Sequence, residues 1–281
     1  DSFMHLSHDI QVVGGAGDNA AAACAISQPF VSLGTSGVLL STRTGECLPL
    51  PASAVHTFSH ALPNAWYQMG VILSCTDSLN WLQRITGKSP AELTLPLDQR
   101  LTEGYEDDSA YTTTCCLWGP NDIEFFPYLS GERTPHNDAA VRGSFIGLST
   151  STTVDDMTEA VIEGICFALR DSLEALKLTG MCLTSLVAVG GGTASKYWLK
   201  TLATILNLPL KLPCDNTGEV ATAKGAARLA MIGIGASHSI DKVVLAPDIQ
   251  CTILPENDII REKYEKKYQK YTQAYSLLSR R

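Results

Sequence analysis

The sequence predicts an α/β domain in which helices flank a mixed β-sheet that contains an antiparallel meander. Three observations lead to this prediction. An apolar run at residues 10–13 enters a glycine-rich turn and an alanine-rich helix, and a run at 186–189 enters a second such turn and helix. Between these two units, short apolar segments separated by turn residues indicate antiparallel strands. Alternating strand-like and helix-like segments are typical of the α/β class.

The predicted strands are short apolar or alternating runs bounded by turn residues such as glycine, proline and asparagine. The turn Gly34-Thr35-Ser36-Gly37 separates two of them, and the aromatic run at 124–128 is expected to be buried. In chain order the strands are expected at 10–13, 30–33, 38–42, 55–60, 66–70, 124–128, 186–189 and 210–212.

The predicted helices are segments in which apolar residues recur every three to four positions. The clearest spans 154–178, where Ala160, Ile162 and Cys166 are among the apolar positions and two aspartates occupy the first turn. In chain order the helices are expected at 18–27, 73–85, 154–178, 195–206 and 220–232.

The 281 residues are 45% hydrophobic and 18% charged, and no long linker divides them. We therefore expect one domain over residues 1–255 and a helical tail of the same domain at 256–281. In this tail, lysines and arginines interleave with tyrosines. Such a strip is compatible with RNA binding, but an amphipathic helix with a solvated charged face is the favoured interpretation.

The net charge of −8 argues against nucleic acid as a partner, because phosphate backbones require a concentrated face of lysine and arginine. No uncharged apolar stretch approaches the roughly 18 residues that cross a bilayer, and no secretion signal is evident at the start. The nine cysteines form no C-x-x-C pair, so we expect reduced, mostly buried thiols. These features predict a cytoplasmic protein without a membrane partner.

Three glycine-rich turns, at 14–17, 34–37 and 190–192, are candidates for phosphate binding. A turn of this kind exposes backbone N–H groups, and at the start of a helix it adds the positive end of the helix dipole. None of the three matches the P-loop or the G-x-G-x-x-G pattern. Glycine turns after strands are common structural devices, so each turn taken alone favours a structural role, and the turn at 34–37 favours an ordinary hairpin.

Asp18 follows the first turn and has two interpretations of equal weight. It is either the N-cap of its helix or a base that accepts the proton of a phosphoryl acceptor. His56 and His60 raise the question of a metal site, but no third ligand is evident, so structural histidines in a strand are favoured and no metal site is predicted.

A longer pattern resembles a known family. The stretch Gly143-Ser144-Phe145-Ile146-Gly147-Leu148, followed by Asp156-Met157 and Ala160-Val161-Ile162-Glu163, is similar to a signature of the FGGY carbohydrate kinases. Further matches occur in the family's order and extend the resemblance over nearly the whole chain. They are Gly17-Asp18-Asn19-Ala20-Ala21, Ser32-Leu33-Gly34-Thr35-Ser36-Gly37, Gly190-Gly191-Gly192 and Gly225-Ala226-Ala227-Arg228-Leu229-Ala230.

The resemblance implies an actin-like, ribonuclease H-like ATPase fold, in which two related α/β domains hold ATP and Mg between them. The chain is similar to the second, nucleotide-binding domain only. The first, sugar-binding domain would carry a D-x-G-T turn, which does not occur in this sequence. We therefore expect a fragment that is inactive alone, that needs the missing N-terminal domain as its partner, and that could form a homodimer through its uncovered face.

The resemblance also assigns roles to particular residues. Asp18 matches the family's general base, and Asn19 would help to hold the sugar. Gly34, Thr35 and Ser36 match a phosphate-binding turn. The residues that match nucleotide contacts along the adenosine are Asn80, Gly191, Gly192 and Lys196, although Lys196 replaces an asparagine found in glycerol kinases.

Within the family, the segments 54–56, 60–63 and above all 127–137 resemble xylulokinases more than glycerol kinases. The implied reaction is the ATP-dependent phosphorylation of D-xylulose to D-xylulose 5-phosphate. Glu132 and Arg133 are equally compatible with a structural or interdomain ion pair and with site residues. Two alternatives stay open: a kinase for another sugar or polyol such as ribulose or gluconate, and a non-catalytic nucleotide-binding or regulatory module of the same fold.

Overall fold

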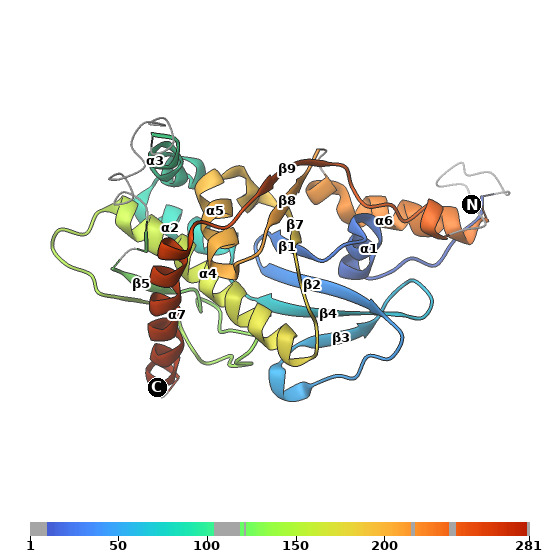
Figure 1. Cartoon of the computed structure of the whole chain (residues 1–281), viewed down its shortest axis with the longest axis horizontal. Coiled ribbons are helices and arrows are strands. Elements are labelled where there is room, and N and C mark those ends of the chain that lie inside the picture. Colours follow the sequence, from blue (N-terminus) through green and yellow to red (C-terminus); the bar gives the residue numbers. More distant parts are fainter. Residues whose placement is uncertain (1–9, 104–118, 121, 215–216, 236–239, 280–281) are drawn as a thin grey trace, which may run out of the picture.

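The computed structural model describes residues 10–103, 119–120, 122–214, 217–235 and 240–279, and its centre is a seven-stranded mixed sheet (Figure 1). The strand order is β3-β4-β2-β1-β7-β8-β9. Strands β1 to β4 form the antiparallel meander, β7 lies parallel to both β1 and β8, and β9 is antiparallel to β8. The strands are β1 (Phe30–Leu33), β2 (Gly37–Thr44), β3 (His56–Ser59), β4 (Ala65–Ile72), β7 (Leu186–Val189), β8 (Leu210–Pro213) and β9 (Ile249–Ile253).

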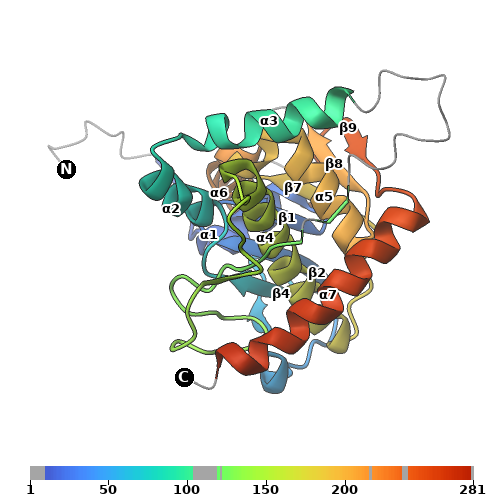
Figure 2. The ribbon, with the colours of Figure 1, turned by 90° about the vertical axis from the view of Figure 1, so that its left-hand side faces the viewer.

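Helices cover both faces of this sheet, because alternate strand residues point to opposite sides (Figures 1 and 2). Val31 and Leu33 belong to the larger core, whereas Phe30 belongs to the smaller core on the other face. The larger core contains α2 (Thr76–Thr86), α3 (Pro90–Glu103), α4 (Val154–Leu178), α5 (Lys196–Leu206) and α7 (Asp258–Leu278). The smaller core contains α1 (Asp18–Ile26) and α6 (Thr217–Gly233). The prediction of a mixed sheet with an antiparallel meander and flanking helices is confirmed.

The long helix α4 has the bounds that the sequence predicts. Its N-terminus carries a capping box, in which the Thr153 hydroxyl accepts from the Asp156 backbone N–H and the Asp156 carboxylate accepts from the Thr153 N–H. Its buried face packs on the sheet and on the two-stranded hairpin of β5 (Glu124–Phe126) and β6 (Ser144–Ile146). Local capping and tertiary burial therefore agree, which explains why this prediction is correct.

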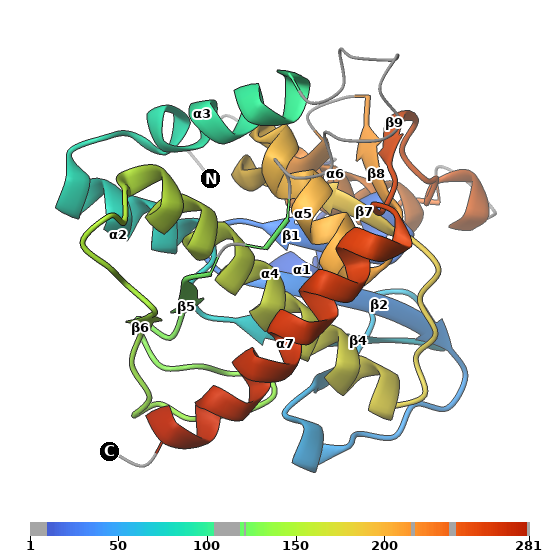
Figure 3. The ribbon, with the colours of Figure 1, turned by 60° about the vertical axis from the view of Figure 1, so that its left-hand side comes forward.

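Helix α7 forms the tail and crosses α4 (Figure 3). Tyr264 and Tyr271 on its inner face are 2% and 1% exposed. The buried Lys267 ammonium pairs with the Glu163 carboxylate of α4 at 2.5 Å and donates to the Ile123 carbonyl at 2.8 Å. The amphipathic-helix interpretation of residues 256–281 is thus correct for the described part, because the tyrosines are core residues rather than an exposed strip.

The segment at 10–13, predicted as a strand, has no regular secondary structure. The prediction is wrong because a strand requires a hydrogen-bonded neighbour, and no described strand pairs with this segment; Val12 is 93% exposed. The helix predicted at 73–85 begins only at Thr76, because the preceding residues bind the turn at 34–37. Helix α3 and strands β6 and β9 were not predicted from the sequence.

Cysteines and histidines contribute to packing in the described part of the chain. Four of the thiols there are buried and three are exposed, all of them unpaired; the buried ones are Cys24, Cys47, Cys75 and Cys166. The His60 ring accepts a hydrogen bond from the Leu62 N–H at 3.0 Å and meets Tyr67 edge to face. Within the described ranges, no helix is both long enough and apolar enough to span a bilayer.

Candidate functional site

Two of the predicted glycine turns meet at one edge of the sheet. Strands β1 and β7 are parallel neighbours, with Ser32 opposite Val189, so both lead into their turns on the same side. The turn after β7 passes very close to β1. Gly190 has φ of +94°, and a Cβ placed on it would lie 2.7 Å from the Leu33 carbonyl oxygen. Only glycine fits this position, so the two turns are fixed against each other.

A cavity of about 330 Å³ opens beside these turns. Its walls come from α2, α3, the 3₁₀ turn at Gly191–Ala194 and the start of α5, and they are mainly apolar. The lining residues are Thr76, Leu79, Asn80, Pro90, Ala91, Thr94, Gly191, Gly192, Ala194, Ser195 and Trp198. A concave, mainly apolar site with a few polar groups is typical of small-molecule binding.

The turn at 34–37 is held by the segment that enters α2. The Thr76 and Cys75 N–H groups each donate at 2.9 Å, to the Gly34 and Thr35 carbonyls respectively. The Ser36 hydroxyl donates to the Leu73 carbonyl at 3.2 Å. Because Thr76 also lines the cavity, the turn lies next to the cavity, with Thr35 and Ser36 exposed to solvent. The turn closes the β1–β2 hairpin, as its sequence taken alone suggests. It also packs against the segment that enters α2.

The outer wall of the cavity is anchored by Asp98 of α3. Its carboxylate accepts from the Ser195 hydroxyl at 2.9 Å and from the Tyr197 N–H at 2.8 Å. Ser195 is also the N-cap of α5 and accepts from the Trp198 N–H. This network joins α3 to α5, the helix that follows the turn at 190–192. It therefore fixes these two walls of the cavity relative to each other.

The structure therefore brings together some of the predicted nucleotide contacts. Asn80, Gly191 and Gly192 line one cavity, and the turn at 34–36 adjoins it. Lys196 is exposed at the start of α5 and is not among the lining residues. The wall supplied by α3 was missed in the sequence analysis. The signal for it was Ser89-Pro90-Ala91-Glu92, a capping-box sequence with proline at the first helical position, and the structure shows both capping bonds.

Asp18 lies apart from this cavity, in the helix layer on the opposite face of the sheet. It is the first residue of α1, and the N-cap is Gly17, so the interpretation of Asp18 as an N-cap is wrong. The exposed Asp18 carboxylate accepts from the Asn19 N–H at 2.7 Å. The pKa of Tyr67 is raised mainly by burial and, to a smaller extent, by the negative charge of Asp18. Asn19 does not line the cavity either.

Helix α1 is fixed in place by α6. A Cβ on Gly225 would come within 1.8 Å of the Ala21 carbonyl oxygen, so the two helices approach to backbone contact. The Arg228 guanidinium donates to the Cys24 and Ala25 carbonyls at the end of α1. The position of Asp18 is therefore set by a rigid helix pair.

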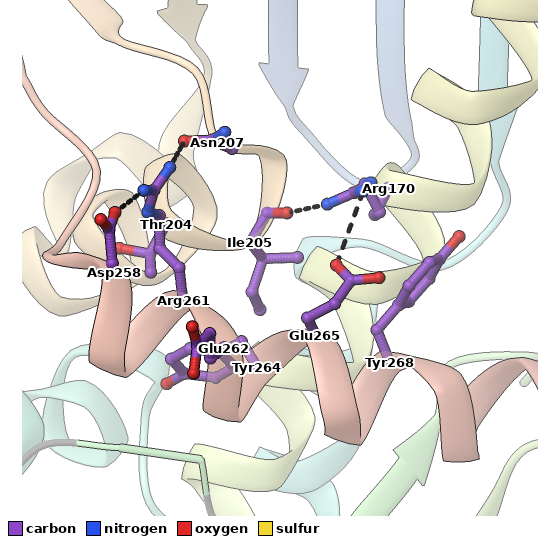
Figure 4. Close-up of a pocket in the computed structure, with 10 residues that line it drawn as sticks. All are labelled: Arg170, Thr204, Ile205, Asn207, Asp258, Arg261, Glu262, Tyr264, Glu265 and Tyr268. Atoms are coloured by element: carbon purple, nitrogen blue, oxygen red, sulfur yellow. Dashed lines mark hydrogen bonds and ion pairs between the residues drawn. The ribbon is translucent and has the colours of Figure 1, made fainter.

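A second cavity, of about 310 Å³, lies between α4, α5 and α7 (Figure 4). Its charged groups pair with one another. Arg170 donates to the Ile205 carbonyl at 2.6 Å and pairs with Glu265 at 3.7 Å, while Arg261 donates to the Asn207 side chain at 2.5 Å and pairs with Asp258. None of the residues predicted for a site lines this cavity, and both of its arginines are already paired with acidic residues of α7.

Two parallel strands that carry glycine turns beside a cavity, with an antiparallel meander completing the sheet, define an actin-like ATPase domain. Residues 30–234 match the C-terminal domain of the FGGY family of carbohydrate kinases, and the chain belongs to this family. The predicted family and fold are both confirmed.

Several proteins are similar to this chain over most of its length. It is 36% identical over 252 residues to the xylulose kinase of Escherichia coli, a match that covers 88% of this chain and 48% of that protein. A crystal structure of a xyloylose kinase from Brucella ovis is similar with a TM-score of 0.82 and 45% identity, covering 94% of this chain and 51% of the other. A xylulose kinase from Rhodospirillum rubrum is similar with a TM-score of 0.75 and 26% identity, covering 97% and 52% of the two chains. The chain spans about half the length of the curated relatives it matches.

Proposed function

We propose that this chain is the nucleotide-binding half of a kinase that transfers the terminal phosphoryl group of ATP to D-xylulose, giving D-xylulose 5-phosphate. One observation carries the proposal. The cavity lined by Asn80, Gly191 and Gly192 adjoins the turn at 34–36, in a chain that is 36% identical to the xylulose kinase of Escherichia coli.

The cavity suits the adenosine part of ATP. Leu79, Pro90 and Trp198 offer apolar surface for a base, and the Asn80 amide can both donate and accept hydrogen bonds. The phosphates would extend toward the turn at 34–36, where glycine allows close approach and two hydroxyls are exposed. Mg²⁺ bound to the phosphates would neutralise their charge, and the exposed Thr35 and Ser36 hydroxyls are compatible with a hydrated Mg–ATP complex beside them.

Asp18 would orient the terminal hydroxyl of the sugar and accept its proton as the hydroxyl oxygen attacks the phosphorus of ATP. The bond from that phosphorus to the bridging oxygen of ADP breaks in the same in-line transfer. The exposure of this carboxylate supports the role, because a bound sugar could reach it from solvent. Asn19 would hold the sugar. We infer that the remaining sugar contacts come from an N-terminal half, so the chain alone should not phosphorylate sugar.

Two measurements test the proposal. Calorimetry of the 281-residue chain should show binding of ATP and ADP that does not depend on D-xylulose. The chain should then be joined to the segment that precedes it in its gene or, as a substitute, to the N-terminal half of the Brucella ovis xyloylose kinase. The joined protein should release ADP with D-xylulose and much more slowly with ribulose, gluconate or glycerol.

Each failure has a distinct meaning. If the chain binds neither ATP nor ADP, the nucleotide site is wrong. ATP binding without ADP release on any sugar in the joined protein would instead favour the non-catalytic module, and faster release with another sugar would reassign the acceptor.

A further inference from the structure

The loop after β5 completes one edge of the main sheet. Strand β3 pairs with β4 only as far as Met69, which leaves the edge of β4 uncovered beyond that residue. Thr134 fills the next position: its N–H donates to the Val71 carbonyl at 2.9 Å, and its hydroxyl accepts from the Val71 N–H at 3.1 Å. The Glu132 carboxyl then accepts from the Leu73 N–H at 3.0 Å. The loop thus takes the place of a strand beside the end of β4. Its last contact along this edge is the one with Leu73.

Leu73 leads directly to the turn at 34–36. Its carbonyl accepts from the Ser36 hydroxyl at 3.2 Å, and the Cys75 and Thr76 N–H groups that follow bind the carbonyls of the same turn at 2.9 Å each. A continuous path of hydrogen bonds therefore runs from Glu132 through Leu73 to the turn. Glu132 binds Leu73, the first residue after β4. The residues that bind the turn follow it in the chain.

Glu132 is itself held firmly. It is 3% exposed, its N–H donates to the Asp138 carbonyl at 2.8 Å, and the Asp138 N–H donates back to its carbonyl at 2.9 Å. One carboxyl oxygen, Oε1, accepts from both Leu73 and Arg133. The other, Oε2, is buried and has no hydrogen-bond partner among the described residues. Burying an oxygen without a partner costs free energy, and the two hydrogen bonds that Oε1 accepts offset part of that cost.

We propose that Glu132 is a positioning residue for the phosphate-binding turn: by fixing Leu73 it sets the place of Ser36 and of the turn that would hold the terminal phosphates of the nucleotide. This inference rests on the proposed function, because it assigns the turn at 34–36 to phosphates. Glu132 does not line the cavity. Changes at Glu132 are nevertheless expected to weaken the binding of the phosphates, through the turn, and to leave the binding of adenosine unchanged.

Calorimetry with ATP and with adenosine on the 281-residue chain tests this directly. Glu132→Ala should weaken ATP binding by about tenfold and change adenosine binding by less than about twofold, because only the turn loses its support. Glu132→Gln should stay within about threefold of the original chain for both ligands, because its amide oxygen can accept the same two N–H bonds. If the alanine variant does not fold, Glu132→Asp serves, because its shorter side chain withdraws the acceptor from Leu73.

Asp171→Ala is the matched control. Asp171 is a buried acid too, but its carboxylate accepts from the Tyr268 hydroxyl of α7, lies 3.8 Å from the His136 ring, and forms no hydrogen bond with the segment at 73–76 within the described part of the chain. The control should lower the melting temperature and leave the ratio of ATP to adenosine affinity unchanged. An equal loss of that ratio in Asp171→Ala and Glu132→Ala would overturn the inference, because general destabilisation would then explain both.

Hydrogen exchange separates the inference from the proposed function. Glu132→Ala, but not Glu132→Gln, should speed exchange of the Cys75 and Thr76 amides that bind the turn, with no ligand present. If the original chain binds neither ATP nor adenosine, the proposed function fails while exchange still decides whether Glu132 holds the turn. Unchanged exchange together with an unchanged affinity ratio in Glu132→Ala would show that it does not.

Discussion

Gly190 determines at a single residue how the two turns meet. Any other side chain would face both a φ of +94° and a Cβ contact of 2.7 Å with the Leu33 carbonyl oxygen. We expect Gly190→Ala to lower the free energy of unfolding by about 2 kcal/mol or more and to weaken ATP binding. Thermal unfolding and calorimetry measure both effects. Gly191→Ala is the control for stability, because a Cβ there meets nothing within 4 Å and should shift the melting temperature little.

Glu132 should also make stability depend on pH. Desolvation by burial raises its pKa from 4.5 to about 8 in the folded chain, despite its two backbone hydrogen bonds. Between these values the folded state holds a proton that the unfolded state releases, so stability is greatest below pH 4.5 as far as this group is concerned and falls as pH rises toward 8. Burial raises the pKa of Asp171 to about 7, which acts in the same direction, whereas burial lowers the pKa of His136 to about 4, which opposes both at acidic pH.

The test compares melting temperatures from pH 5 to pH 9 for the original chain and for Glu132→Gln. The full effect of the Glu132 shift amounts to about 5 kcal/mol, since each pKa unit corresponds to about 1.4 kcal/mol. The variant should lose less stability than the original chain over this range. Parallel curves for the two proteins would contradict the assignment of the proton to Glu132.

Sequence reasoning singled out some residues that line this cavity and not others, for physical reasons. Asn80, Gly191 and Gly192 lie in one cavity as the family resemblance implied, because a motif carries its position in the fold with it. Thr94 and Trp198 line the same cavity without belonging to a motif. Only the tertiary packing of α3 on α5 brings them there, and packing of this kind is not visible in local patterns.

At the level of elements, Asp98 should matter more than its sequence suggests. It accepts two hydrogen bonds that join α3 to α5 and so fixes the wall of the cavity. Asp98→Ala should cost about 1–3 kcal/mol of stability and weaken the binding of adenosine as well as of ATP, unlike Glu132→Ala. Gln99→Ala, an exposed neighbour on the same helix, should change neither. Unaltered adenosine affinity in Asp98→Ala would show that α3 is not a wall of the binding site.

One buried ion pair contributes to the attachment of α7, beside the packing of its tyrosines. Lys267 and Glu163 are 8% and 1% exposed and lie 2.5 Å apart, so removing one charge leaves the other buried. We expect Lys267→Met to lower the free energy of unfolding by about 3–5 kcal/mol, measured by urea denaturation. Lys266→Met, at the exposed neighbouring position, should have little effect. If both variants unfold at the same urea concentration, the pair does not hold the helix.

Elements with strong local signals were predicted well. The bounds of α4 and β7 agree with the predicted 154–178 and 186–189, because capping and apolar periodicity act locally. The strand expected at 10–13 failed because pairing depends on a neighbour that local sequence does not specify. Helix α3 was overlooked in spite of its capping box, since Pro96 inside it weakens the helical pattern.

At the scale of the whole molecule, the chain carries the C-terminal domain of the FGGY family and spans about half the length of the curated relatives it matches. Asp18 lies in the layer formed by α1 and α6, while the cavity lies on the other side of the sheet, so in the proposed reaction the phosphates would have to extend past the sheet edge to reach Asp18. In the protein joined to an N-terminal half, Asp18→Asn should reduce turnover by about 10²–10⁴-fold and leave ATP affinity nearly unchanged. Turnover close to normal in this variant would exclude Asp18 as the base, and Asp77→Asn, a change at another acidic first-turn position, is the control.

The wall that α3 gives to the cavity has a consequence for chemical biology. Ala91 and Thr94 reach the cavity from a helix outside the main sheet, so side chains there can be trimmed without disturbing the strands. Removing the Thr94 methyl and hydroxyl groups would enlarge the space for a base and admit nucleotide analogues with bulky substituents. An enzyme built on this domain could then be addressed in a mixture by an orthogonal cosubstrate that other kinases reject.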